Sequence, residues 1–172
     1  LHAGMYYPTD SLKARLCVEG NALSHEFFAR YDVPFKRSGK YIIARDETEE
    51  TEIERLYANA SRNGVPSMRR VSMKTFKEQF PFVRAHAAIF SGSTGILDAA
   101  DYLATLHALL DRRNVEVLKP CRAFAVISGP AIETDRGKLE ADVVINAAGL
   151  YADEIAKSAG VHEYEIMPLK GD

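Results

Sequence analysis

Residues 141–160 read ADVVINAAGLYADEIAKSAG, and this stretch decides the fold class. Val143, Val144 and Ile145 form an apolar run that predicts a strand buried on both faces. The small residues 147–149 follow it, and an amphipathic helix comes next. Because this turn carries almost no side chains, its backbone can approach a bulky ligand closely. Ligands of open α/β sheets bind at the carboxyl ends of strands, so the pattern predicts an α/β domain that holds a dinucleotide here.

The usual opening of a dinucleotide-binding domain is missing from the chain, because no GxGxxG occurs in its 172 residues. The first residue is Leu1 rather than methionine, and no terminating pattern precedes Asp172. We therefore expect the chain to be a piece of a longer polypeptide, with an incomplete sheet.

The composition, 47% apolar and 27% charged, is typical of a globular protein. The formal net charge of -2 provides no basic surface for nucleic acid or an anionic membrane. Cys17 and Cys121 are too few for a disulfide framework or a zinc site, which indicates a reducing, cytoplasmic compartment. No apolar run approaches the ~20 residues of a transmembrane span, although peripheral association with a membrane stays open. The histidines have no partner spacing, so no metal site is predicted.

Local patterns predict the other elements. Ser11 caps a helix that Gly20 and Asn21 could interrupt, and Asp98 caps a later helix that should pack on a sheet. Val115 and Val117 open a further strand. The predicted elements are helices over 12–31, 47–63, 72–79 and 98–112, strands over 41–44, 87–90 and 123–127, and a hairpin with arms 131–134 and 138–142.

Seven short motifs occur in a specific order along nearly the whole chain. They are HAGMYY (2–7), SLKARLC (11–17), SGK (38–40), NGVP (63–66), TGILD (94–98), AAGLYAD (147–153) and PLKGD (168–172). In this order the chain resembles the FAD-dependent oxidoreductases of the D-amino-acid-oxidase superfamily, and most closely the L-2-hydroxyglutarate dehydrogenases and oxidases.

The resemblance implies two partial domains. Residues 1–31 and 93–162 would form an incomplete FAD/NAD(P)-binding Rossmann-like domain, and residues 32–92 and 163–172 part of an α+β substrate domain. The implied reaction oxidises a small-molecule 2-hydroxy acid, with L-2-hydroxyglutarate as the expected substrate, to the 2-oxo acid by hydride transfer to FAD. A sibling enzyme that oxidises glycerol 3-phosphate or an amino acid, a nicotinamide-linked reductase, and a noncatalytic interaction module stay open as alternatives.

The resemblance also implies roles for residues near the flavin ring. His2, Ala3 and Gly4 correspond to a loop that passes beside the ring, and His2 is the candidate for proton transfer. Tyr6 and Lys170 are candidates for the substrate site. The alternatives are that Tyr6 fills the domain junction and that Lys170 is a solvated side chain.

Other residues correspond to the nucleotide end of FAD. Ala123 matches a position whose backbone touches the adenine, and Ala147, Ala148 and Gly149 match the turn beside the adenosine and pyrophosphate. Without the glycine fingerprint nothing receives the pyrophosphate charge, so the isolated chain is expected to bind FAD weakly or not at all and to be inactive. An incomplete sheet exposes apolar surface, which predicts either a homo-oligomer or a rearranged sheet.

Overall fold

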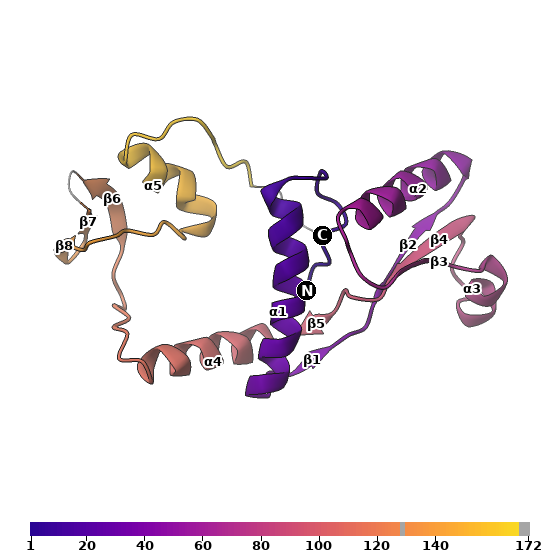
Figure 1. The fold of residues 1–172 in the computed structure, drawn as a ribbon, viewed down its shortest axis with the longest axis horizontal. Coiled ribbons are helices and arrows are strands. Elements are labelled where there is room, and N and C mark those ends of the chain that lie inside the picture. The colour runs from indigo at the N-terminus through magenta and orange to yellow at the C-terminus, as the bar shows by residue number, and fades with distance from the viewer. Residues whose placement is uncertain (128–129, 169–172) are drawn as a thin grey trace. The chain divides into compact units, whose positions relative to one another are not determined.

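The computed structural model describes residues 1–127 and 130–168. The chain divides into two compact units, Leu1–Val115 and Glu116–Asp172, whose elements are labelled in Figure 1. Helices and strands are mixed in both units, which confirms the α/β class. These two units do not test the two partial domains expected from the sequence. The boundaries of those domains stay a prediction.

Helix α1 (Leu12–Tyr31) begins at the predicted cap, where the Ser11 hydroxyl accepts a hydrogen bond from the Ala14 N–H at 3.1 Å. The predicted interruption at Gly20 and Asn21 is wrong, because the helix is continuous. The physical reason is that the Asn21 amide bonds to carbonyls of other segments instead of competing for its own helix backbone.

A three-stranded antiparallel sheet lies at the centre of the first unit. Its strands are β2 (Lys40–Ala44), β4 (Ala87–Ser91) and β3 (Met68–Arg70), in the order β2-β4-β3. Successive side chains of a strand point to opposite faces. On one face Ala44 and Ile89 pack with Ile53 of α2 (Glu47–Arg62) in a buried cluster.

The opposite face of this sheet is aromatic. Tyr41 and Phe90 are cross-strand partners with ring centroids 4.8 Å apart. Phe76 and Phe80, from and just after α3 (Met73–Gln79), each place their rings 5.3 Å from that of Tyr41. The sheet therefore packs against α2 on one face and against aromatic side chains of the α3 segment on the other. Figure 1 shows α2 and α3 beside this sheet.

Helix α4 (Ala99–Asp111) follows an antiparallel pair of two-residue strands, β1 (Phe35–Lys36) and β5 (Ile96–Leu97). Asp98 caps α4 as predicted, since its carboxylate accepts from the Ala100 and Asp101 N–H groups at 2.9 and 3.0 Å. The expectation that α4 packs on a sheet is wrong, because none of its residues is buried. Its Tyr102 ring instead packs on aromatic rings of α1.

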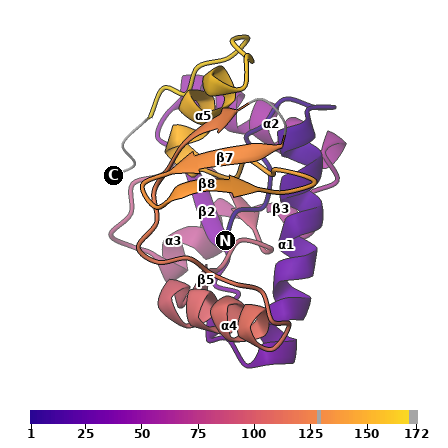
Figure 2. The ribbon, with the colours of Figure 1, turned by 90° about the vertical axis from the view of Figure 1, so that its left-hand side faces the viewer.

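The second unit contains an antiparallel sheet in the order β6-β7-β8, and β7 and β8 lie side by side in Figure 2. The bounds of its elements are β6 (Ala123–Ile127), β7 (Ala131–Thr134), β8 (Gly137–Glu140), a 3-10 turn at Gly149–Tyr151 and α5 (Ala152–Ser158). The Val126 N–H donates to the Ser158 hydroxyl at 2.8 Å, which joins β6 to the end of α5.

Two strands expected from the sequence are absent. Val143 and Ile145 are 73% and 84% exposed, and residues 143–145 form no strand. A strand is buried on both faces only where neighbouring strands and covering elements supply partners, and no described segment pairs with this one. Residues 115–119 likewise form no strand, so the strand expected from Val115 and Val117 is wrong.

Candidate functional site

The loop of residues 2–7, called the flavin loop here, begins with the segment His2–Gly4 that is predicted to lie beside the flavin. It is anchored in the first unit and exposes His2 at its surface. Ala3 and Met5 are 3% and 1% exposed, and their burial in the hydrophobic core anchors the loop. Gly4 has a φ of +91°, and a Cβ there would lie 3.0 Å from Val18 Cγ2 on α1. Glycine is therefore required at this position both by the backbone and by close packing.

One asparagine amide joins this loop to a second loop, residues 91–95. The Asn21 side-chain N–H groups donate to the His2 carbonyl at 2.9 Å and to the Ser93 carbonyl at 3.0 Å. Leu1 and Gly95 exchange two further backbone hydrogen bonds at 2.6 and 3.3 Å. The first residues of the chain and the 91–95 loop therefore run together.

Asn59 of α2 and Asn63, which caps the end of α2, hold the other end of the flavin loop. Asn59 donates to the Met5 and Tyr7 carbonyls at 2.9 and 2.8 Å, and Asn63 donates to the Gly4 and Tyr7 carbonyls at 3.2 and 2.9 Å. The carbonyls of an irregular loop have no partners of the kind that a helix or sheet provides, and the two side-chain amides supply the missing hydrogen bonds. The two asparagines therefore hold the loop backbone at Gly4, Met5 and Tyr7.

Three side chains near this loop bear on its chemistry. Tyr6 is 53% exposed, and the Lys40 ammonium lies 4.7 Å from the centroid of its ring, which places a cation beside the predicted substrate residue. The Cys17 thiol lies 3.8 Å from the His2 carbonyl oxygen, and burial raises its pKa. Cys17 is therefore no thiolate nucleophile near neutral pH.

The second unit contains a cavity of about 590 Å³ that unites two of the predicted nucleotide-binding positions. Ala123 at the start of β6 and Ala148 before α5 both line it. Ala147 and Gly149 adjoin Ala148 in the sequence but do not line the cavity. Its walls consist of Cys121, Arg122, Ala123, Phe124, Ala148, Tyr151, Glu154 and Ile155.

The cavity fits the nucleotide end of FAD in size and in chemistry. Small-molecule sites have volumes of about 300–1,000 Å³ and combine apolar walls with a few polar groups. Ala123 and Ala148 leave room for a bulky ring, Phe124 and Tyr151 offer aromatic surfaces, and the Arg122 guanidinium lies 5.5 Å from the Phe124 ring centroid. A planar heterocycle joined to an anionic group matches this set of side chains.

Sequence reasoning placed the alanines but missed the aromatic and cationic walls, as well as the three asparagines. The signal for Asn21 is its position in a helix interior, where asparagine is unfavourable unless its side chain has another use. Nothing in the local sequence distinguishes Phe124 or Tyr151 from core aromatics. Lys170 lies outside the described residues.

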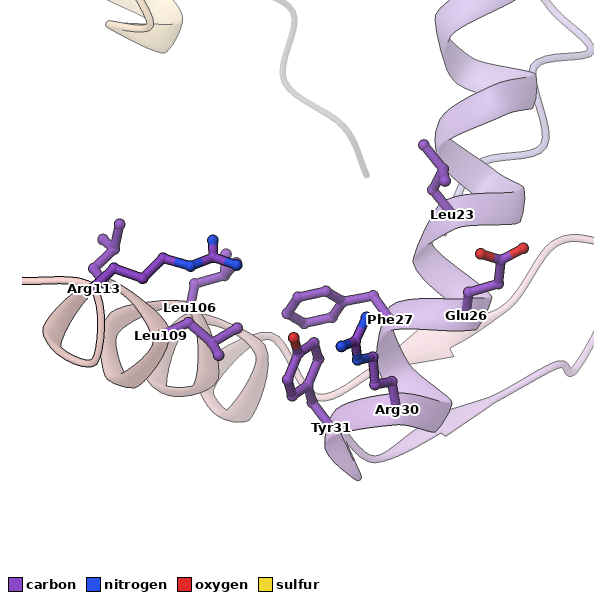
Figure 3. Close-up of a pocket in the computed structure, with 9 residues that line it drawn as sticks. Leu23, Glu26, Phe27, Arg30, Tyr31, Leu106, Leu109 and Arg113 are labelled. Carbon is purple, nitrogen blue, oxygen red and sulfur yellow. The ribbon is translucent and has the colours of Figure 1, made fainter. Parts of the chain in front are cut away.

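A second cavity of about 590 Å³ lies between α1 and α4 and contains none of the predicted site residues. Figure 3 shows Phe27 and Tyr31 on α1 facing Leu106 and Leu109 on α4. Within residues 1–127 and 130–168 no group of three metal-ligating side chains occurs, and no helix is long and apolar enough to cross a membrane.

Comparison with known proteins identifies relatives over the whole chain. A family described as "FAD dependent oxidoreductase" (DAO) matches residues 1–172. The mitochondrial L-2-hydroxyglutarate dehydrogenases of Homo sapiens and Caenorhabditis elegans are each 31% identical to the chain over its full length, with 41% and 42% of those proteins covered. The L-2-hydroxyglutarate dehydrogenase of Indibacter alkaliphilus is 27% identical, with 44% covered. The chain thus spans about two fifths of the length of these curated relatives.

Solved structures agree on the fold. L-proline dehydrogenase from P. horikoshii superposes with a TM-score of 0.76 at 18% identity, covering 91% of this chain and 43% of that one. Glycine oxidase from Geobacillus kaustophilus superposes with a TM-score of 0.76 at 19% identity, covering 92% of this chain and 45% of that one. At such identities the likeness shows the fold, and it confirms the predicted Rossmann-like α/β class.

Proposed function

The chain belongs to the DAO family of FAD-dependent oxidoreductases, and we propose that it is part of an enzyme that oxidises L-2-hydroxyglutarate to the 2-oxo acid. The observation that carries this proposal is the 31% identity over the whole chain to L-2-hydroxyglutarate dehydrogenases. The structural neighbours whose names refer to amino acids share only 14–19% identity, so they favour no amino-acid substrate.

The residues of the second unit would hold the nucleotide end of the cofactor. FAD, when bound, accepts the hydride from the α-carbon of the hydroxy acid. Ala123 and Ala148 leave space for the adenosine portion, and Arg122 supplies a positive charge at the same cavity. Ala147 and Gly149, which adjoin Ala148, would keep the turn narrow enough for its backbone to approach the ligand.

The residues of the first unit would orient the substrate and handle its proton. Ala3 and Gly4 fix the backbone of the loop, while the exposed His2 imidazole is suited to accept the hydroxyl proton as the hydride leaves. Tyr6, with the Lys40 ammonium over its ring, would face a carboxylate of the substrate. Lys170 stays a candidate substrate residue on the basis of its motif alone.

The proposal is tested on the natural full-length polypeptide. Dye reduction is measured with L-2-hydroxyglutarate, its D enantiomer, glycerol 3-phosphate, glycine and L-proline under the same conditions. We expect turnover with L-2-hydroxyglutarate and little with the others. Preferred turnover of glycerol 3-phosphate or an amino acid would assign the protein to a sibling activity, and no bound flavin at all would favour an interaction module.

A second measurement concerns the 172-residue chain alone. Because it contains no glycine fingerprint, we expect it to bind FAD weakly or not at all. Titration with FAD, followed by flavin fluorescence, measures this, and a micromolar or tighter site would contradict the expectation. The cytoplasmic location, the peripheral membrane association and the homo-oligomer stay predictions. The names of the animal relatives carry the word mitochondrial, and that of the bacterial relative does not.

A further inference from the structure

Asn21 is an unusual residue in the interior of a helix. It is 4% exposed, and it uses both of its side-chain N–H donors on backbone carbonyls that belong to other segments. Asparagine lowers the stability of an isolated helix, so its presence here is explained by these long-range bonds rather than by α1 itself.

The second partner of Asn21, the Ser93 carbonyl, lies in the tightly packed 91–95 loop. Within the 91–95 loop the Ser91 and Thr94 hydroxyls lie 2.9 Å apart in a hydrogen bond. A Cβ at Gly95 would stand 2.7 Å from the Lys36 carbonyl oxygen, so this loop is seated tightly against the backbone near β1. Asn21 therefore ties His2 to a segment that has little freedom to move.

The His2 imidazole has no hydrogen bond to any described side chain or backbone group, so only its backbone fixes its place. Asn59 and Asn63 bind the loop from Gly4 onward, whereas at His2 itself the Asn21 amide is the stronger of two donors to the carbonyl, the other being the Cys17 thiol. Loss of the Asn21 amide would leave the buried Ser93 carbonyl without a partner among the described residues, and the His2 carbonyl with only the weak Cys17 thiol donor at 3.8 Å. This is costly unless the loop opens to water.

We infer that Asn21 is a positioning residue, whose amide sets the place of the His2 imidazole through the His2 backbone. This inference rests on the proposed function, in which His2 lies beside the flavin ring. It adds a role for a residue that touches neither flavin nor substrate and acts only through the His2 and Ser93 carbonyls.

The test uses the natural full-length polypeptide loaded with FAD and two variants, Asn21→Leu and Asn59→Leu. Leucine has the same branched arrangement of side-chain heavy atoms as asparagine but no donor. Hydrogen exchange of the backbone amides in residues 2–7, the visible absorption spectrum of the flavin, and kcat with KM are measured for each variant.

We expect Asn21→Leu to raise the exchange rates at residues 2–4 about tenfold or more, because the hydrogen bond that holds the His2 carbonyl is lost and the buried backbone of Ala3 and Gly4 can then open to water. It should also shift the flavin band and lower kcat more than it raises KM. Asn59→Leu should raise exchange at residues 5–7 and leave residues 2–4 protected. Should Asn21→Leu fail to fold, Asn21→Ser, with one short donor, should give a smaller effect of the same sign.

The two hypotheses fail in different ways. Unchanged exchange at residues 2–4 in the Asn21 variant would overturn the positioning role, whatever the flavin does. Faster exchange with an unchanged flavin spectrum would instead overturn the placement of His2 beside the flavin, which belongs to the proposed function.

Discussion

Gly39 lies directly against the ring of Phe90, so that a Cβ atom at Gly39 would stand 2.1 Å from Phe90 Cζ. Gly39 has a φ of +66°, and its N–H donates to the Thr94 carbonyl at 2.9 Å. The Arg69 guanidinium lies 4.5 Å from the centroid of the same ring, and the ring of Tyr41 lies 4.8 Å from it. Movement of the Phe90 ring away from an added Cβ would therefore disturb its contacts with Arg69 and Tyr41.

The substitution Gly39→Ala should destabilise the first unit. The left-handed backbone costs an alanine about 1–2 kcal/mol, and overpacking typically costs about 1–3 kcal/mol. We expect the free energy of unfolding to fall by about 2–4 kcal/mol in a denaturant titration. The matched control is Gly20→Ala in α1, where an added Cβ meets nothing within 4 Å.

Alanine at position 20 should stabilise the helix by about 0.5–1 kcal/mol, because it replaces a flexible glycine. A similar loss of stability in both variants would contradict the role assigned to the contact between Gly39 and Phe90.

The ion pair between Arg45 and Glu49 at the start of α2 predicts how the stability of the fold depends on pH. The Arg45 guanidinium and the Arg45 N–H both donate to the Glu49 carboxylate, the latter at 2.7 Å, and they lower the pKa of Glu49 to about 2. Because the folded pKa lies below the ordinary value, this carboxylate stabilises the fold above about pH 4.5, and its contribution is lost as pH falls toward about 2.

Titration of the Glu49 carboxyl carbon by NMR measures this pKa. In Arg45→Gln the side-chain donor that has the largest effect is gone, while the backbone N–H is retained. The pKa of Glu49 should therefore rise part of the way toward its ordinary value. Arg15→Gln on α1 serves as the control and should leave it unchanged. A Glu49 that titrates near 4.5 in the unsubstituted protein would show that the ion pair does not persist in solution.

If the cavity of the second unit binds the nucleotide end of FAD, a larger side chain in its wall should weaken FAD binding. Ala148→Leu places a larger side chain in the wall shared with Ala123, and we expect FAD to bind about tenfold or more weakly, since overpacking a fitted site costs 1–3 kcal/mol. Flavin fluorescence titration of the full-length polypeptide gives the Kd. Ala159→Leu, at an exposed position after α5 that does not line the cavity, should bind FAD normally. Equal affinities for the two variants would exclude the cavity as the adenosine site.

Local rules in the sequence predicted the helices well, but they also predicted two strands, over 143–145 and from Val115, that the structure does not form. The side chains of Ser11 and Asp98 cap α1 and α4, because a cap depends on bonds within a few residues. Residues 143–145 have the apolar character of a strand, yet they lie exposed, because burial of a strand depends on partners far away in the sequence.

In the candidate site too, local sequence signals do not predict features that depend on distant segments. Small residues at positions 123 and 148 were predicted from motifs, and the structure places them in one cavity. The sequence around Asn21 indicates only a residue that could interrupt its helix. Its bond to the Ser93 carbonyl depends on how the 91–95 loop folds back onto the start of the chain, and a local pattern contains no trace of this.

His25 on α1 gives the last prediction. Both of its ring nitrogens are buried and have no hydrogen-bond partner among the described residues, while the ring centroid lies 5.4 Å from that of Phe35. A buried polar group without a partner destabilises a fold by about 1–3 kcal/mol, and its replacement by an apolar group of similar shape is neutral or favourable. His25→Leu should therefore leave the free energy of unfolding unchanged or raise it by up to about 2 kcal/mol.

Denaturant titration at neutral pH measures the effect of His25→Leu, with His107→Leu as the matched control. The His107 side chain on α4 is 43% exposed, and its Nδ1 lies 3.4 Å from an Asp111 carboxylate oxygen, so its loss should change stability by less than about 0.5 kcal/mol. A clear loss of stability in His25→Leu alone would contradict the prediction. It would mean that the contact of the imidazole ring with Phe35 outweighs the cost of its unpaired nitrogens.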